Sequence, residues 1–250
     1  MFHERYDDMI LQIYFEASIM NGIILILVSR EIKKIVLINP NSNSNSTKSM
    51  ADLARLEADG KYEIVERTNT GVPLLLSTPE HYTNAVSGVV QIGKEEAKDG
   101  NVVAIIVSAF SDPGLKELRA EVDIPVFGIG EEVFHAAAEG NRKFGIVTIT
   151  PNPSLLKSFA DKAKSLGYEN LYQGVRVTEG DFNDLVASPS KMDAALIEAV
   201  NNSISLDSAG AVIVGCGPCS IAGLRIQTHF DIPIEAAVPA AARAAIKTLQ

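Results

Sequence analysis

The strongest constraint on the fold is that the sequence repeats itself. IVLINPN at 35–41 resembles IVTITPN at 146–152, and DIPV at 123–126 resembles DIPI at 231–234. The paired segments follow the same order at nearly the same offset along the chain. We therefore expect two copies of one structural unit, which face each other as two similar lobes.

Within each half, short β-branched runs alternate with alanine-rich segments of helical apolar spacing. The predicted strands are Ile35–Ile38, Tyr62–Arg67, Val102–Val107, Val126–Ile129, Phe144–Thr148, Val175–Val177, Ala211–Val214 and Ile234–Ala236. The predicted helices are Thr47–Ala58, Pro79–Asp99, Glu131–Glu139, Pro153–Leu166 and Lys191–Ser203. Continuous apolar strands separated by helices are typical of a parallel sheet covered on both faces. The sequence thus predicts an α/β fold with two pseudo-symmetric lobes, each a mainly parallel sheet flanked by helices, and an active site between them.

The expected division is a first α/β lobe over 34–142 and a second over 143–250, and it allows a strand or helix near the C-terminus to exchange between lobes. Residues 1–33 fit neither lobe, and we interpret them as an N-terminal extension. Their apolar stretch at 20–28 is too short to span a membrane, so an interfacial helix is the alternative. The acidic HERYDD segment argues against a secretory signal.

Composition limits the classes of partner. The chain has 250 residues, of which 46 % are hydrophobic, and a formal net charge of −9 with interspersed lysines and arginines. No clustered positive surface for nucleic acid is expected, whereas backbone N–H groups can still bind a small carboxylate. With two cysteines only, the sequence predicts free thiols in a reducing cytoplasm. A homo-oligomer is the ordinary expectation.

Cys216 is the candidate for chemistry, because it follows an apolar strand and precedes a helix. The N–H groups and dipole of that helix stabilise a thiolate, and Gly215 and Gly217 give a ligand access to the backbone. A buried structural cysteine is the alternative. Together, Cys216 and Cys219 also form a C-x-x-C motif of the type found in thioredoxin-like oxidoreductases. In those proteins the motif lies early in the domain, whereas here the residues after it suffice for only one helix, one strand and a tail.

The repeat places Ala109 opposite Cys216, since both stand at nearly the same distance before the DIP segment of their half. Two such loops at the ends of parallel strands are expected on opposite walls of one cleft. The segment NPNSN at 39–43, which includes Asn41 and Ser42, follows the first strand. Its Asn and Ser side chains can either cap the helix near Thr47 or hold a substrate carboxylate or amide, and TITPNP at 148–153 is the equivalent segment of the second half.

Metal and nucleotide cofactors are not expected. His81, His135 and His229 lack metal-ligand spacing and are interpreted as helix-surface or packing residues. The segment GIG at 128–130 lacks the third glycine of a dinucleotide fingerprint, and there is no phosphate-binding P-loop.

Several dispersed motifs carry a family resemblance: INPNSN at 38–43, FSDPGL at 110–115, PVFGIGE at 125–131, FGIVT at 144–148 and VGCGP at 214–218. They resemble the aspartate/glutamate/hydantoin racemase superfamily, and most of all its hydantoin and allantoin racemase branch. The resemblance implies an isomerase that needs no metal, pyridoxal or nucleotide. It also implies one cysteine from each lobe, the two flanking an acidic carbon, so that one takes a proton and the other returns it to the opposite face.

The chain departs from that pattern at one position. The second cysteine of the motif falls on Cys216, but the first falls on Ala109, which cannot move a proton. Ser108 or Ser111 could substitute; alternatively Ala109 was introduced by design, or the enzyme is a single-cysteine lyase similar to arylmalonate decarboxylases. A ligand-binding relative without turnover is a further alternative.

By resemblance, then, the expected protein is a racemase or epimerase of a small carboxylate or hydantoin-like molecule. The expected catalytic residues are Cys216 and Ser111. The expected substrate contacts are Asn41, Ser42, Phe110, Ser111, Thr148 and Gly217.

Overall fold

The computed structural model describes residues 32–76, 78–217 and 219–250. The extension predicted over 1–33, including its apolar stretch, therefore lies outside the described residues except for its last two. Residues 33–250 form one compact unit. Within the described ranges, no helix is long and apolar enough to cross a membrane.

The strands are β1 (Lys34–Asn39), β2 (Glu63–Thr68), β3 (Val102–Val107), β4 (Val126–Gly128), β5 (Phe144–Thr148), β6 (Tyr172–Val177), β7 (Ala211–Val214) and β8 (Ile234–Ala236). The helices are α2 (Ser44–Ala58), α3 (Pro79–Glu96), α4 (Leu115–Arg119), α5 (Ile129–Ala138), α6 (Pro153–Ser165), α7 (Phe182–Ala187), α8 (Pro189–Asp207), α9 (Ser220–Ile226) and α10 (Ala237–Thr248). Two 3₁₀ turns, η1 (Glu139–Asn141) and η2 (Gln227–His229), follow α5 and α9.

The strands form two four-stranded sheets with the orders β2-β1-β3-β4 and β6-β5-β7-β8. Every strand pair in both sheets is parallel. Adding four to each strand number of the first sheet gives the second, so the two halves share one topology. The predicted α/β class, the parallel sheets and the internal repeat are confirmed.

Each predicted strand overlaps an observed one, although β2 and β6 at the sheet edges are only partly buried. The inner strands have the clearest apolar runs. β1 shows this clearly, since Ile35 to Ile38 are fully buried. The short helices α4 and α7 were not predicted, nor was α10. Along α10 the buried alanines and the exposed Arg243 and Lys247 follow helical spacing, so the sequence did carry a signal for this helix.

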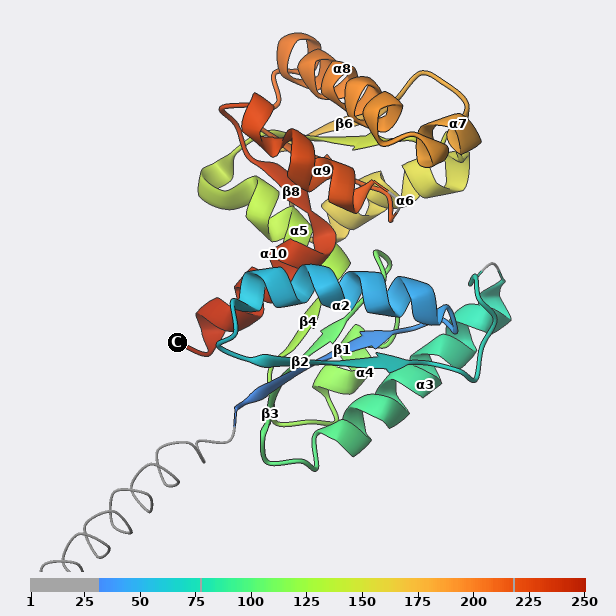
Figure 1. Cartoon of the computed structure of the whole chain (residues 1–250), viewed down its shortest axis with the longest axis vertical. Coiled ribbons are helices and arrows are strands. Elements are labelled where there is room, and N and C mark those ends of the chain that lie inside the picture. Colours follow the sequence, from blue (N-terminus) through green and yellow to red (C-terminus); the bar gives the residue numbers. More distant parts are fainter. Residues whose placement is uncertain (1–31, 77, 218) are drawn as a thin grey trace, which may run out of the picture. The chain divides into compact units, whose positions relative to one another are not determined.

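Helices α5 and α10 follow the last strand of each sheet and pack on each other (Figure 1). Helix α5 also contacts β7 and β8 of the second sheet, whereas α10 contacts β3 and β4 of the first sheet together with α2. Alanines along α10, including Ala241 and Ala245 at 0 % exposure, permit this close approach. The two halves thus exchange helix contacts, while the exact lobe boundaries stay a prediction.

Gly130, in the first turn of α5, lies directly against the loop that follows β3. A Cβ atom built at this position would stand 1.9 Å from the carbonyl oxygen of Phe110. Backbone atoms cannot yield as a flexible side chain does, so only glycine permits this contact between helix and loop.

We therefore predict that Gly130→Ala lowers the free energy of unfolding by about 3 kcal/mol. Gly100→Ala is the matched control, because a Cβ atom there meets nothing within 4 Å, and it should change stability by less than about 1 kcal/mol. Urea unfolding followed by circular dichroism measures both variants. Equal stability of the two would contradict the described contact.

Candidate active site

A cavity of about 690 Å³ lies where the loops after β1, β3, β5 and β7 meet α2, α5, α9 and α10. Its lining comes from both halves of the repeat. The residues are Asn39, Asn41, Asn43, Asn45, Ser46, Ser49, Met50, Leu53, Ser108, Ala109, Phe110, Ile129, Thr150, Leu155, Phe182, Val214, Gly215, Cys216, Gly217, Ser220, Ile221, Ala237 and Val238.

Ala109 and Cys216 occupy equivalent places in the two sheets and line this one cavity. Ala109 is the second residue after β3, and Cys216 is the second residue after β7. The strands β3 and β7 themselves hold the same position in their sheets. The structure therefore brings together the two loops that the repeat pairs.

Cys216 sits at the turn from β7 into α9. The turn is close-packed at Gly215, where a Cβ atom would lie 2.7 Å from Cγ2 of Ile146, whereas a Cβ at Gly217 would meet nothing within 4 Å. Gly215 thus permits the packing of the turn, and Gly217 leaves space beside the cavity. The Ser220 hydroxyl donates to the Cys216 carbonyl oxygen at 3.3 Å, which ties the turn to the helix.

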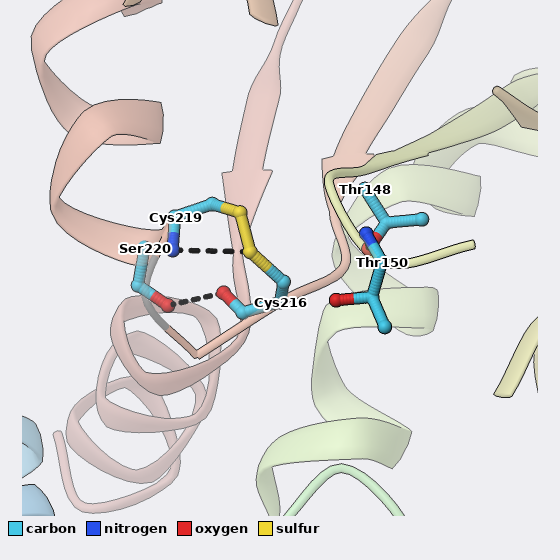
Figure 2. The surroundings of a disulfide bond; sticks show 5 residues. All are labelled: Thr148, Thr150, Cys216, Cys219 and Ser220. Carbon is cyan, nitrogen blue, oxygen red and sulfur yellow. Dashed lines mark hydrogen bonds between the residues drawn. A yellow bond between two sulfur atoms is a disulfide. The ribbon is translucent and has the colours of Figure 1, made fainter. Parts of the chain in front are cut away.

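The expectation of free thiols was wrong. Cys216 and Cys219 form a disulfide (Figure 2). The turn passes straight into α9, and this brings the two Cα atoms to 5.3 Å, inside the range of about 4.4–6.8 Å usual for disulfides. The Cys219 N–H donates to the Cys216 sulfur at 3.1 Å.

An asparagine-rich loop after β1 forms the polar part of the wall. Asn43 caps α2 by accepting from the Ser46 N–H at 3.1 Å, so the predicted capping role is confirmed for this segment. The Asn41 side-chain oxygen accepts from the Asn43 N–H at 2.9 Å and from Nδ2 of Asn39 at 3.0 Å. Because the loop occupies that oxygen, Nδ2 is the Asn41 donor that a ligand in the cavity could use.

Aromatic and aliphatic side chains form much of the remaining wall, beside hydroxyl groups such as those of Ser108 and Thr150. Phe110 packs edge-on against Phe134 and Phe159, with ring centroids 5.9 Å and 5.1 Å apart. Phe159 belongs to α6, so Phe110 joins the loop after β3 to the second half of the chain. Nearer the solvent, Phe182 and Ile221 are 40 % and 52 % exposed.

Among the described residues that line the cavity, none has a lysine, arginine, histidine, aspartate or glutamate side chain. A charged ligand group would have to be stabilised there by amides, hydroxyls and backbone N–H groups alone. Burying such a group without a counter-charge is costly. The lining therefore favours an uncharged ligand.

Of the predicted site residues, Cys216, Asn41, Phe110 and Gly217 line the cavity. Ser111, Ser42 and Thr148 do not appear in the lining; Ser111 is exposed, and Thr148 is fully buried. The hydroxyl oxygen of Thr148 accepts from the Thr150 N–H at 3.3 Å. The structure thus offers no support for Ser111 as a catalyst. The predicted roles of Ser111, Ser42 and Thr148 stay predictions.

Ser220 is one polar residue of the second-half wall outside the expected substrate contacts, and Thr150 is another (Figure 2). The repeat contained a signal for it, because ITPN at 149–152 aligns with INPN at 38–41 and so pairs Thr150 with Asn39. No comparable signal marks Phe182 or Ile221, which reach the cavity from α7 and α9.

Comparison with known proteins decides the family. Residues 35–245 match the family described as Asp/Glu/hydantoin racemase. The chain belongs to this racemase family. It is an isomerase, and the predicted superfamily is confirmed.

Two relatives illustrate the likeness. A hydantoin racemase from Rhizobium meliloti is 26 % identical over 212 residues, which cover 84 % of this chain and 86 % of that protein. An allantoin racemase from Klebsiella pneumoniae has a similar fold, with a TM-score of 0.76, 22 % identity and 87 % of each chain covered. Arylmalonate decarboxylase shares the fold more distantly, with a TM-score of 0.62, 15 % identity and 86 % and 91 % of the two chains covered.

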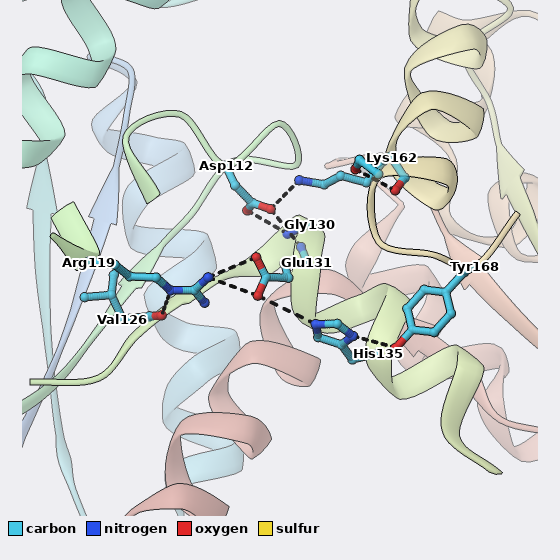
Figure 3. Close-up of polar contacts among 9 residues, drawn as sticks. Asp112, Arg119, Val126, Gly130, Glu131, His135, Lys162 and Tyr168 are labelled. Carbon is cyan, nitrogen blue, oxygen red and sulfur yellow. Dashed lines mark hydrogen bonds and ion pairs between the residues drawn. The ribbon is translucent and has the colours of Figure 1, made fainter. Parts of the chain in front are cut away.

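In this racemase, a buried carboxylate fixes the loop that carries Ala109. The Asp112 side chain accepts from the N–H groups of Gly130 and Glu131 at 2.9 Å and 2.7 Å (Figure 3). It also forms an ion pair with Lys162 of α6. Burial raises the pKa of the Asp112 carboxyl, and Lys162 and the two N–H groups only partly offset that cost. One side chain therefore links the Ala109 loop, α5 and the second half.

Beside this link, Glu131, Glu132 and His135 come close enough together to hold a metal ion. Arg119 donates to both carboxylate oxygens of Glu131 at 3.1 Å, and His135 is hydrogen-bonded to the Tyr168 hydroxyl at 2.7 Å (Figure 3). A cation would have to displace Arg119 from Glu131. We therefore interpret these three side chains as part of a stabilising polar network and not as a metal site.

We predict that Asp112→Ala lowers the free energy of unfolding by about 3 kcal/mol, because it leaves Lys162 and two helix N–H groups without their acceptor. Asp161→Ala on α6 is the control, since its ion pair with Lys157 is exposed and should contribute less than about 1 kcal/mol. Thermal and denaturant unfolding would measure the difference. Equal losses of unfolding free energy in the two variants would show that the buried Asp112 contacts contribute no more than the exposed ion pair.

Proposed function

We propose that the enzyme racemises a hydantoin-like small molecule without a cofactor, and that Cys216 moves the proton. The observation that carries this proposal is the position of Cys216, on the wall of an uncharged cavity that also presents the asparagine loop. Among the described residues that line the cavity, Cys216 is the only one whose side chain can form a strong base near neutral pH.

The substrate proposal follows from the chemistry of the wall. A hydantoin ring is uncharged and carries both N–H donors and carbonyl acceptors, which suit side-chain amides and hydroxyls such as those of Asn41 and Thr150. An apolar substituent on the ring carbon would pack beside Phe110 or Phe182. The similarity to a protein named hydantoin racemase supports the same choice of substrate.

In the proposed reaction, the Cys216 thiolate removes the hydrogen from the ring carbon between a carbonyl carbon and a nitrogen. The electron pair spreads onto the carbonyl oxygen, where hydrogen-bond donors of the cavity wall stabilise the enolate. Protonation by the Cys216 thiol on the same face restores the original enantiomer. Inversion requires a proton on the other face.

That other face would meet Ala109, whose methyl group cannot donate a proton. Inversion must then draw on a weaker donor such as water, whereas the Cys216 thiol exchanges its own hydrogen with solvent. We therefore expect exchange of the ring hydrogen with solvent to be faster than inversion of configuration.

This asymmetry gives a direct test with one enantiomer of a neutral 5-substituted hydantoin in D₂O. Proton NMR measures exchange, and chiral chromatography measures inversion. Exchange by the reduced wild type should exceed inversion roughly tenfold or more, and Cys216→Ala should abolish both activities. Ala109→Cys should raise inversion roughly a hundredfold, so that it approaches the rate of exchange.

Ala109→Ser is the matched control, because it has nearly the same size as the cysteine variant but a much weaker acid. It should leave inversion close to the wild-type rate. If Cys216→Ala kept the wild-type exchange rate, the proposed base would be wrong. If Ala109→Cys gained no inversion, the second face of the substrate would not lie at Ala109.

Ala109 also favours a second reaction, the decarboxylation of a substituted malonate by a single cysteine. Loss of CO₂ generates the carbanion, so only one proton donor is needed, and the fold is shared with arylmalonate decarboxylase. The uncharged lining argues against a doubly charged malonate. Release of CO₂ from substituted malonates, without exchange on hydantoins, would favour this reaction over racemisation.

A further inference from the structure

The two cysteines lie in very different surroundings although they are bonded to each other. Cys216 is half-buried and lines the cavity, whereas Cys219 is fully buried in the core of the second half, at 0 % exposure. A thiol or disulfide from solution can therefore reach the Cys216 sulfur through the cavity, while Cys219 is shielded. This is the arrangement of an attacked sulfur and a resolving sulfur.

The turn already has the backbone geometry of the bridge. The Cα atoms lie 5.3 Å apart within one turn, so we expect the bond to form and open by movement of the two side chains while β7 and α9 stay in place. The Cys219 N–H points at the Cys216 sulfur, at 3.1 Å, and it would stabilise the thiolate released when the bridge opens. Both states of the pair are thus compatible with the same fold.

The bridge uses the same sulfur that the proposed racemisation requires. A sulfur in a disulfide has no ionisable proton, so it can neither remove a hydrogen as thiolate nor return one as thiol. We propose, resting on the proposed function, that the Cys216–Cys219 pair is a reversible redox switch which blocks catalysis when oxidised and permits it when reduced.

The exchange is balanced with a low-molecular-weight disulfide as oxidant. The Cys216 thiolate attacks the disulfide, one thiol leaves, and a mixed disulfide forms on Cys216. The Cys219 thiolate then attacks the Cys216 sulfur, and the second thiol leaves. The protein pair loses two electrons and two protons, the oxidant becomes two thiols, and excess thiol reverses both steps.

The test equilibrates the enzyme in a series of glutathione redox buffers and measures ring-hydrogen exchange, intact mass and alkylation by iodoacetamide. Wild type at the oxidised end should be lighter by two hydrogens, unreactive to alkylation and at least roughly tenfold less active, and thiol should restore it. In Cys219→Ala the buried resolving thiol is absent. At buffer ratios that inactivate wild type, the exchange rate of Cys219→Ala should fall less than about twofold from the rate of the same variant when fully reduced. The reason is that oxidation of this variant stops at a mixed disulfide, which is not followed by the intramolecular second step.

Cys219→Ser repeats the test if the alanine variant fails to fold. The switch is refuted if wild type stays a dithiol in every buffer, if it forms the bridge and keeps its activity, or if the Cys219 variants are inactivated as readily as wild type. A reduced wild type that exchanges no hydrogen on neutral hydantoins would refute the proposed function instead. In that case mass and alkylation would still report whether the bridge forms.

Discussion

The packing of α5 against α10 determines where every other part of the site can lie. Each helix begins directly after the last strand of one sheet and contacts strands of the other, so the two helices join the two sheets through one apolar cluster. The strand-end loops on both sides then border one cavity. Asp112 stabilises this arrangement, since its carboxylate accepts from the Gly130 N–H at the N-terminus of α5 and forms an ion pair with Lys162.

This symmetric framework carries an asymmetric pair of residues. Ala109 and Cys216 hold equivalent positions, but only one of them can exchange a proton. The proposed chemistry is therefore one-sided, and all of it depends on one sulfur. The same sulfur is bonded to Cys219, so the redox state of the pair and the proposed activity are expected to change together.

Sequence patterns predicted the sheets well, because β-branched runs and an internal repeat can be recognised in the order of the residues alone. They did not predict α10 or the inward direction of Asp112 beside the exposed Ser111. That direction depends on Gly130 and Lys162, which are distant in sequence. The disulfide likewise depends on the turn between β7 and α9 more than on the spacing of the cysteines.

A crystal structure of the reduced enzyme with a neutral 5-substituted hydantoin would show whether the Cys216 sulfur lies where it can take the ring hydrogen. We expect the ring inside the cavity, its amide groups on the asparagine loop, and its hydrogen-bearing carbon about 3–3.5 Å from the Cys216 sulfur. The Ala109 methyl group should face the opposite side of that carbon. A ring bound outside the cavity, or one whose reactive carbon points away from Cys216, would contradict the account.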